Sequence, residues 1–365
     1  MNKKRCFTFI LAVVFAVMAV AMMFSGCAKE DGSMTGNNDG KERLVGVTYS
    51  TWFPPLTGQK WGTPILGEYN SSDEAVIEQH AKWLVDAGVD FIMIDWTNNM
   101  NHVYGEQDGN LEYIESATAV VFDVFARLEK APKIVIAGGV NSADQALAFV
   151  DGTMQRRANE IWDNFYGKPE YQDLILHFEG KPLLCLYLST PAVAAKPGDE
   201  IFSDERYTIK YFTGFLGQQE NLVREGTRIS KYGYWSWWER GNNVYAVNED
   251  GSAECITISA AWVGEAPPDE AIDNPNSGWL QENGGMGRRN GDTFREQWDM
   301  AIGLDPEIVL VQSFNEWVSE TLPGKAAEEY NAEYSNDIEP SVEHGYLYMN
   351  ILKEKAAIYK NGGAE

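Results

Sequence analysis

"SSDEAVIEQHAKWLVDAGVDFIMIDW" (71–96) contains a helix pattern followed directly by a strand pattern. Up to Gly88 the apolar residues recur at helical spacing, and Ser71 or Ser72 can cap the first turn. From Val89 onward the residues are almost all apolar, which is typical of a strand covered on both faces. This stretch therefore predicts a helix that ends near Gly88 and leads into a buried strand ending in Asp-Trp.

The same alternation of patterns continues along the chain. Strand-like runs occur at 44–53, 89–96, 133–140, 181–188, 207–215, 231–238, 254–263 and 307–314. Further helix-like segments occur at 111–131, 142–165, 293–304 and 344–360. Alternation repeated about eight times predicts an α/β protein with a (β/α)8 TIM barrel, formed as one domain by residues 42–365. An open doubly wound sheet is the alternative, and the lack of a GxGxxG motif after the first strand disfavours its nucleotide-binding version.

Charge and aromatic content restrict the class of ligand. The formal net charge is −25 and no basic patch is present, so we expect no binding to nucleic acid. The 12 Trp and 17 Tyr residues supply ring faces that suit the C–H faces of sugars. The sequence has no phosphate loop and no metal-ligand spacing, so neither a cofactor nor a metal is predicted. Cys185 and Cys255 lie in apolar runs and are expected to be buried free thiols.

The amino terminus has the order of a bacterial secretory signal. Three basic residues, a long apolar run and small residues precede Cys27, and "FSGC" resembles a lipobox. We expect residues 1–26 to be a lipoprotein signal peptide, Cys27 to carry the lipid and 27–41 to form a flexible tether. A retained anchor helix is the alternative. This organisation predicts a cell-envelope lipoprotein that is held to the membrane by Cys27. The acidic "KED" at 29–31 resembles a sorting tag that sends lipoproteins to the outer surface, so we expect exposure there.

Chemically active side chains follow several of the predicted strands. In a barrel the carboxyl ends of the strands, with the loops after them, form the site. Acids and amides there can bridge sugar hydroxyl groups, and indoles can stack on sugar rings. These candidates are Tyr49, Trp52, Asp95, Trp96, Asn98, Tyr187, Trp235, Glu239, Trp262, Asn315, Glu316, Trp317 and Glu320. The composition predicts a carbohydrate-binding site.

The carboxylates also have structural alternatives. Asp95 alternatively caps the next helix or pairs with a lysine, Glu239 alternatively pairs with Arg240, and Glu320 alternatively faces solvent. Polar groups expected to be structural or solvated are His80, His344 and the acidic run 327–340.

Two blocks of the sequence resemble a known group of enzymes. "PILGEYNSSDEAVIEQHAKWLVDAGVDFIMIDW", and later "GRRNGDTFREQWDMAI" with "PEIVLVQSFNEWVSET" and "DIEP", resemble glycoside hydrolase family 99-like and family 71-like proteins. The resemblance implies a (β/α)8 barrel that acts on α-linked glycans without a metal. It matches Asp95, Asn315, Glu316 and Trp317 to the motifs of the group, and Arg289 to the arginine of the penultimate loop. The His-Ile-Glu-Pro-Tyr motif, which carries the catalytic acids of the endo-mannosidases, is absent.

Hydrolysis of a glycosidic bond requires one carboxylic acid to protonate the leaving oxygen and a second carboxylate to assist at the anomeric carbon or activate water. We expect Glu316 and Glu239 to form this pair, with Asp95 as an alternative partner or an acceptor for a substrate hydroxyl. The sequence thus predicts a lipid-anchored glycoside hydrolase acting on an oligo- or polysaccharide of α-mannan or α-glucan type. The rival hypothesis is a non-catalytic surface glycan-binding lipoprotein with the same barrel.

Overall fold

The computed structural model describes residues 40–52, 60–97, 109–139, 152–188, 202–214, 216, 220–237, 240–264, 281–317 and 331–363. The chain divides into two units, Met1–Asp39 and Gly40–Glu365, and every described residue lies in the second. The signal peptide, Cys27 and all but the last two residues of the predicted tether therefore lie outside the described residues. None of the helices in the described ranges combines the length and the apolar character needed to span a membrane.

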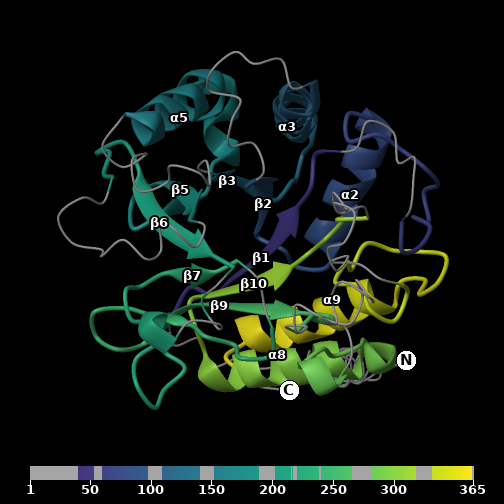
Figure 1. Ribbon diagram of the computed structural model, residues 1–365. Helices are drawn as coiled ribbons and strands as arrows, with labels where there is room; N and C mark the ends of the chain where they lie inside the picture. Colours follow the sequence, from purple (N-terminus) through teal and green to yellow (C-terminus); the bar gives the residue numbers. More distant parts are fainter. Residues whose placement is uncertain are drawn as a thin grey trace, which may run out of the picture. The chain divides into compact units, whose positions relative to one another are not determined.

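The strands form one sheet whose neighbours follow the order of the sequence (Figure 1). They are β1 Leu44–Tyr49, β2 Phe91–Trp96, β3 Lys133–Gly139, β4 His177–Phe178, β5 Lys181–Tyr187, β6 Thr208–Thr213, β7 Trp235–Ser236, β8 Ala246–Val247, β9 Ala253–Ser259 and β10 Ile308–Gln312. The order is β7-β6-β5-β3-β2-β1-β10-β9-β8, with β4 beside β5. All pairs are parallel except β4 with β5 and β8 with β9. Because β1 pairs with β10, this is the order of a barrel and not of a doubly wound sheet.

Side chains join the two parallel strands at which the sheet closes. The hydroxyl of Thr257 in β9 donates to the carbonyl of Ser236 in β7 at 2.5 Å. The indole of Trp235 donates to the carboxylate of Glu254 at 2.5 Å. The predicted (β/α)8 barrel is thus confirmed as a nearly closed, mostly parallel barrel.

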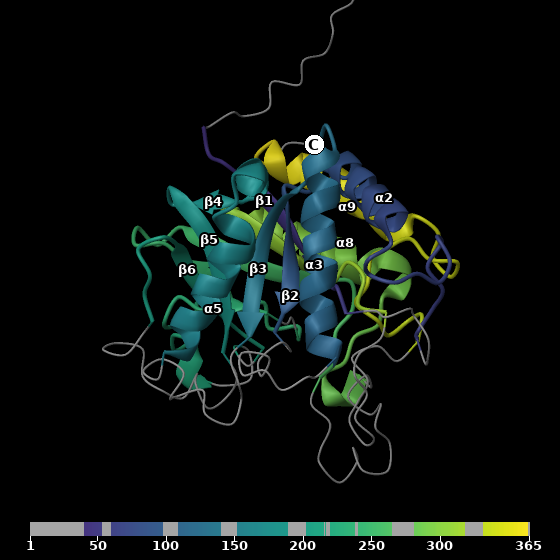
Figure 2. The same cartoon turned by 90° about the horizontal axis from the view of Figure 1, so that it is seen from above.

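Helices cover much of the outside of the sheet, as two perpendicular views show (Figures 1 and 2). They are α2 Glu74–Asp86, α3 Gly109–Arg127, α5 Thr153–Ile161, α8 Asp292–Leu304 and α9 Leu347–Lys360. Shorter helical turns are Trp162–Tyr166, Pro169–Leu174, Glu220–Leu222, Gln281–Asn283 and Arg289–Gly291. The predicted helices are confirmed, but 142–165 is helical in the described part only from Thr153 and becomes a π-helical turn after Ile161.

The start of α2 differs from the prediction. Neither Ser71 nor Ser72 caps the helix, because its N-cap is Asp73. The Asp73 carboxylate does not bind a helix N–H group and accepts the backbone N–H of Asn70 at 3.0 Å instead. The end of the helix agrees with the prediction, since Gly88 follows it with a φ of 79°.

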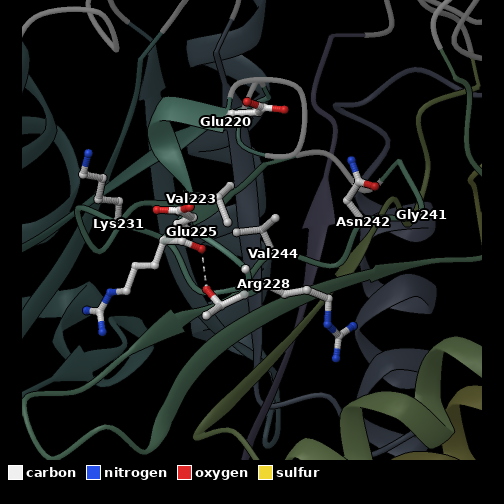
Figure 3. A pocket seen from close by; sticks show the side chains of 11 residues that line it. Glu220, Val223, Glu225, Arg228, Lys231, Gly241, Asn242 and Val244 are labelled. Carbon is white, nitrogen blue, oxygen red and sulfur yellow. Dashed lines mark hydrogen bonds between the residues drawn. The ribbon is translucent and has the colours of Figure 1, made fainter.

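One flank of the barrel has a different covering. Between β6 and β9 the described residues form no α-helix, and contain instead the turn Glu220–Leu222, a bridge between Val223 and Ser230, and β8. A hollow of about 1200 Å³ lies on this flank (Figure 3). The charged residues that line it are Glu220, Arg224, Glu225, Arg228 and Lys231. The lining carries both positive and negative charges, and the side chains of Arg228 and Lys231 point to opposite sides. The hollow therefore does not define one class of ligand.

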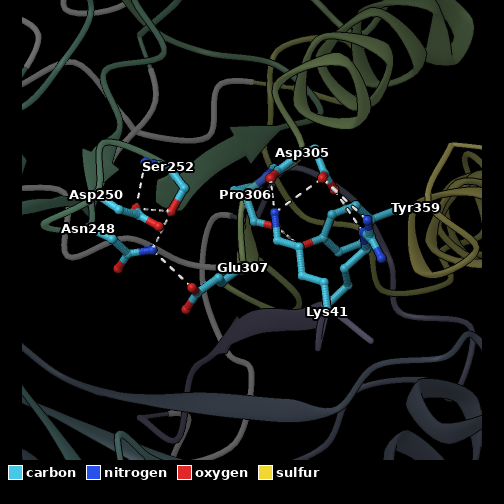
Figure 4. Close-up of polar contacts among 9 residues, drawn as sticks. Lys41, Asn248, Asp250, Ser252, Asp305, Pro306, Glu307 and Tyr359 are labelled. Atoms are coloured by element: carbon cyan, nitrogen blue, oxygen red, sulfur yellow. Dashed lines mark hydrogen bonds and ion pairs between the residues drawn. The ribbon is translucent and has the colours of Figure 1, made fainter. Parts of the chain in front are cut away.

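The amino-terminal end of the barrel is held by polar contacts (Figure 4). Arg43 binds the carboxylate of Asp305 at 2.7 Å, and Lys41 joins the same carboxylate at 3.2 Å. The Tyr359 hydroxyl donates to the carbonyl of Pro306 at 2.9 Å. These contacts tie the start of β1 to the loop before β10 and to α9, so this end of the barrel has a structural role.

Side chains of the central strands alternate between two apolar cores. Phe91 and Met93 of β2 belong to the cluster inside the barrel, while Ile92 and Ile94 belong to the cluster between the sheet and the helices. Cys185 and Cys255 also lie in the interior cluster, where both are free thiols as predicted. Burial raises the pKa of both thiols, which keeps them protonated and unreactive.

The interior is filled so closely at Gly46 that a side chain there should destabilise the barrel. A methyl carbon at this position would lie 2.2 Å from the ring of Phe91. We expect Gly46→Ala to lower the free energy of unfolding by about 1–3 kcal/mol through overpacking. Gly303→Ala in α8 is the matched control, because an added methyl carbon there meets no atom within 4 Å beyond the local helix backbone, and it should be neutral or slightly stabilising. Urea unfolding of both variants checks this, and equal stability of Gly46→Ala and the wild type would contradict it.

Candidate functional site

The alternation of β2 places Asp95 and Trp96 on opposite faces. Asp95 follows Phe91 and Met93 in phase and pairs with Ala137 of the interior cluster, so its side chain faces the barrel interior at the carboxyl end of the strand. It is 4% exposed, and one carboxylate oxygen accepts the backbone N–H of Thr97 at 2.7 Å.

Trp96 belongs to the outer cluster. Its indole donates to the hydroxyl of Thr118 in α3 at 2.9 Å, and its ring lies beneath the guanidinium of Arg157. This placement puts Trp96 between the sheet and the helices, away from the interior face on which Asp95 lies.

Two aromatic rings meet on the interior face near the carboxyl ends of β5 and β7. Tyr187 and Trp237 are half-buried, pack against the interior cluster and contact each other edge to face at 6.1 Å between ring centres. Trp235 is fully buried below them, where its indole binds Glu254. Trp237 was expected at the end of this strand along with Trp235, and the two-residue period of the strand places both rings on the interior face.

Asn315 joins the carboxyl ends of β1 and β10. Its side-chain oxygen accepts the backbone N–H of Ser50 at 2.8 Å, and its side-chain nitrogen donates to the backbone carbonyl of Ser50 at 3.1 Å. Asn315 is 1% exposed, so this link lies inside the protein. The amide therefore fixes the two strand ends against each other, which positions the next residue, Glu316.

Glu316 follows directly and is half-buried. Its backbone N–H donates to the carboxylate of Asp337 at 2.5 Å and also contacts the Ser313 hydroxyl at 3.2 Å. The Ser313 hydroxyl donates to the same Asp337 oxygen at 2.7 Å. The main chain that carries Glu316 is thus held by a carboxylate from the segment before α9.

Asp337 is buried with a strongly basic neighbour. Its second carboxylate oxygen accepts the indole N–H of Trp61 at 2.6 Å, while Arg288 donates to the backbone carbonyl of Asp337 and to Ser335. Burial raises the pKa of Asp337 to about 6, although its hydrogen bonds to Ser313 and Trp61 lower it.

Trp317 is fully buried in a polar network and is stacked on Trp61 at 4.7 Å between ring centres. Its indole donates to Glu339 at 2.6 Å. The same carboxylate accepts the Tyr69 hydroxyl at 2.7 Å and binds His80 at 3.1 Å. His80 is thus structural, as predicted.

The predicted site residue Tyr49 joins this network from β1. Its hydroxyl contacts the other ring nitrogen of His80 at 2.9 Å, and the side chain lies in the outer cluster. Burial raises the pKa of Tyr49, so its hydroxyl stays protonated. The prediction that the acidic run 327–340 is solvated is wrong at its end, because Asp337 and Glu339 are buried as hydrogen-bond acceptors.

The remaining candidates lie around these elements. Arg289 binds Thr293 and Glu296 of α8, and the fully buried arginine of this loop is its neighbour Arg288. Trp52 is half-buried between the outer cluster and the Trp61–Trp317 pair. The indole of Trp262 donates to the Gly284 carbonyl at 3.0 Å. Candidates outside the described residues are Asn98, Glu239 and Glu320.

The fold has counterparts among solved structures. The GH99 endo-α-mannosidase from Bacteroides thetaiotaomicron aligns over 88% of this chain and 98% of its own, with a TM-score of 0.50 and 14% identity. Its complex with bis-tris-propane aligns over 88% and 99%, with a TM-score of 0.51 and 14% identity. This chain has the family 99 barrel fold. The resemblance noted in the sequence is thereby confirmed for the fold.

Other comparisons add less. A glycoside hydrolase-like protein of known structure is 16% identical, with a TM-score of 0.49 and coverage of 86% of this chain and 94% of that one. No family model and no curated protein matches the sequence.

Within this family 99-like barrel, the described carboxylates at the carboxyl end come from nearby strands. Asp95 is the penultimate residue of β2 and Glu316 follows β10, and only β1 lies between these strands. Carboxylates can donate or accept protons, and the rings of Tyr187 and Trp237 can contact the apolar face of a sugar. Among the described residues, no three His, Cys, Asp or Glu side chains gather closely enough to hold a metal ion.

Proposed function

We propose that this protein is a glycoside hydrolase that cleaves an α-linked polysaccharide or glycan with a pair of carboxylates. The observation that carries the proposal is the position of Asp95, which faces the barrel interior at the carboxyl end of β2 with Glu316 two strands away. In this fold that end of the barrel is where catalytic groups are found. The family 99 fold counterpart is an endo-α-mannosidase, which favours α-mannan as the first substrate to test.

The proposed reaction uses Glu316 with one further carboxylate, either Glu239 or Asp95. One group protonates the leaving glycosidic oxygen while the other assists at the anomeric carbon or activates water. If Glu239 is the partner, Asp95 accepts a substrate hydroxyl. The rings of Tyr187 and Trp237 support a sugar on the same interior face.

We also propose that the enzyme is anchored to the outer surface of a bacterial envelope through Cys27. The order of basic, apolar and small residues before this cysteine, with the polar stretch after it, supports the anchor, and the acidic "KED" at 29–31 supports the outer surface. An anchored surface hydrolase would meet polysaccharides that are too large to cross the envelope.

Intact cells that produce the full chain test both proposals. We expect them to release reducing ends from α-mannan or α-glucan and not from a β-linked glucan. Cells producing Cys27→Ser should lose the surface-bound activity, because that side chain cannot form the thioether to the lipid. If the cells bind the polymer but release no reducing ends, the proposed hydrolase activity is contradicted and a glycan-binding lipoprotein is favoured. If cells producing Cys27→Ser keep their surface-bound activity, the proposed lipid anchor is contradicted, but the proposed hydrolase activity is not.

A further inference from the structure

The carboxylate of Asp337 lies among groups that all donate to it. One oxygen accepts the Ser313 hydroxyl and the Glu316 backbone N–H, and the other accepts the indole of Trp61. An ionised carboxylate only accepts hydrogen bonds, so the ionised form satisfies every partner. A protonated carboxyl carries its hydrogen either on the oxygen that accepts the Trp61 indole or on the oxygen that accepts Ser313 and Glu316.

The Ser313 hydroxyl can rotate and become an acceptor, but a backbone N–H and an indole N–H cannot. Protonation of Asp337 therefore has one of two effects. It places the carboxyl O–H opposite the indole N–H of Trp61, or it weakens the hydrogen bond from the Glu316 backbone N–H. Because Asp337 is 1% exposed, water does not replace the lost bonds.

We propose that Asp337 is a positioning residue that holds the main chain of Glu316 in its working geometry only while its carboxylate is ionised. The inference rests on the proposed function, and it adds a regulation of the same site by pH. Asp337 contacts no substrate in this scheme and acts through the backbone of Glu316. Catalysis should therefore fall as the pH decreases through the range in which Asp337 gains its proton.

The pKa of Asp337 places this range near neutrality. Burial raises the pKa to about 6, so the carboxyl is mainly ionised above that pH and mainly protonated below it. The charged and titratable residues around it are Arg288 before α8, Glu316 after β10, whose backbone N–H binds Asp337, Glu339 on its own segment, and Glu343 and His344 before α9. Burial lowers the pKa of His344, which favours the neutral form of that ring.

The amide of Glu316 gives a direct readout that needs no substrate. In the full chain labelled with ¹⁵N-glutamate, the signal of Glu316 is the one missing from Glu316→Gln. We expect its chemical shift to titrate with a midpoint at about pH 6. On the α-linked glycan that the wild type hydrolyses, kcat should fall below the same midpoint by about tenfold per pH unit.

Variants separate this role from a general effect on stability. Asp337→Asn should abolish both the amide titration and the acid limb of kcat. Trp61→Phe removes one hydrogen bond to the ionised form, so it should raise both midpoints, and it keeps the test available if Asp337→Asn does not fold. The control is Asp250→Asn, in an exposed turn at the amino-terminal end of the barrel, which should change neither midpoint.

The role of Asp337 would be overturned if the Glu316 amide chemical shift did not change with pH. It would also be overturned if Trp61→Phe left the midpoint of the fall in kcat unchanged. An amide titration that kcat does not follow would overturn it as well. A wild-type chain that titrates as expected but hydrolyses no glycan would instead overturn the proposed function, and would still support the ionisation-dependent contact between Asp337 and Glu316.

Discussion

Glu316→Gln should lower kcat on an α-linked glycan by a factor of about 100 to 10,000, the usual loss when a general acid or base is removed. Glutamine has the shape of glutamate but cannot give or take a proton. The contacts that Asp337 and Ser313 make with residue 316 involve its backbone N–H, so the substitution leaves them intact. Initial rates of reducing-end release at several glycan concentrations would separate kcat from KM.

The second carboxylate is identified by parallel variants. Asp95→Asn and Glu239→Gln are made in the same chain, and the one whose kcat falls as far as that of Glu316→Gln carries the partner group. Glu354→Gln, on an exposed position of α9, is the matched control and should keep wild-type rates. Full activity of Glu316→Gln would remove this residue from the mechanism.

Glu339→Ala should lower the free energy of unfolding by about 3–5 kcal/mol. The substitution removes the acceptor of three buried side chains, Tyr69, His80 and Trp317. Two of these groups are O–H and N–H donors that water cannot reach after the change. The loss also leaves a cavity beneath the segment that carries Glu316, which adds to the cost.

Glu339→Gln should cost much less than Glu339→Ala. Its amide oxygen can still accept from Tyr69 and Trp317, and its NH2 group can donate to His80 if that ring takes the tautomer that donates to Tyr49. Urea unfolding of both variants, with the exposed Glu354→Ala as control, checks the comparison. An equal loss in Glu339→Ala and Glu339→Gln would mean that the hydrogen bonds at this site contribute little.

Much of the fold could be predicted because the strands are long apolar runs separated by amphipathic helices. The strands β2 and β10 lie within the predicted runs 89–96 and 307–314 and fill most of each run. The covering between β6 and β9 could not be predicted, since short turns and bridges leave no period in the sequence. The cap of α2 was misassigned because Asp73, Ser72 and Ser71 are all good N-cap residues.

The site was predicted less completely for a related reason. A strand that is apolar on both faces does not reveal which side chains face the interior, so Asp95 and Trp96 appeared equivalent. Likewise, an acidic loop normally faces water, and only the positions of Trp61 and Trp317 show why Asp337 and Glu339 are buried.

The pairing of the first strand with the last also affects how the chain acquires its structure. Lys41 and Asp305, which meet at the start of these strands, are 264 residues apart in sequence. Contacts of such separation form late and slow the folding reaction. One edge of β1 therefore has no strand partner until synthesis has passed Gln312, so the barrel closes only after nearly the whole sheet has been made.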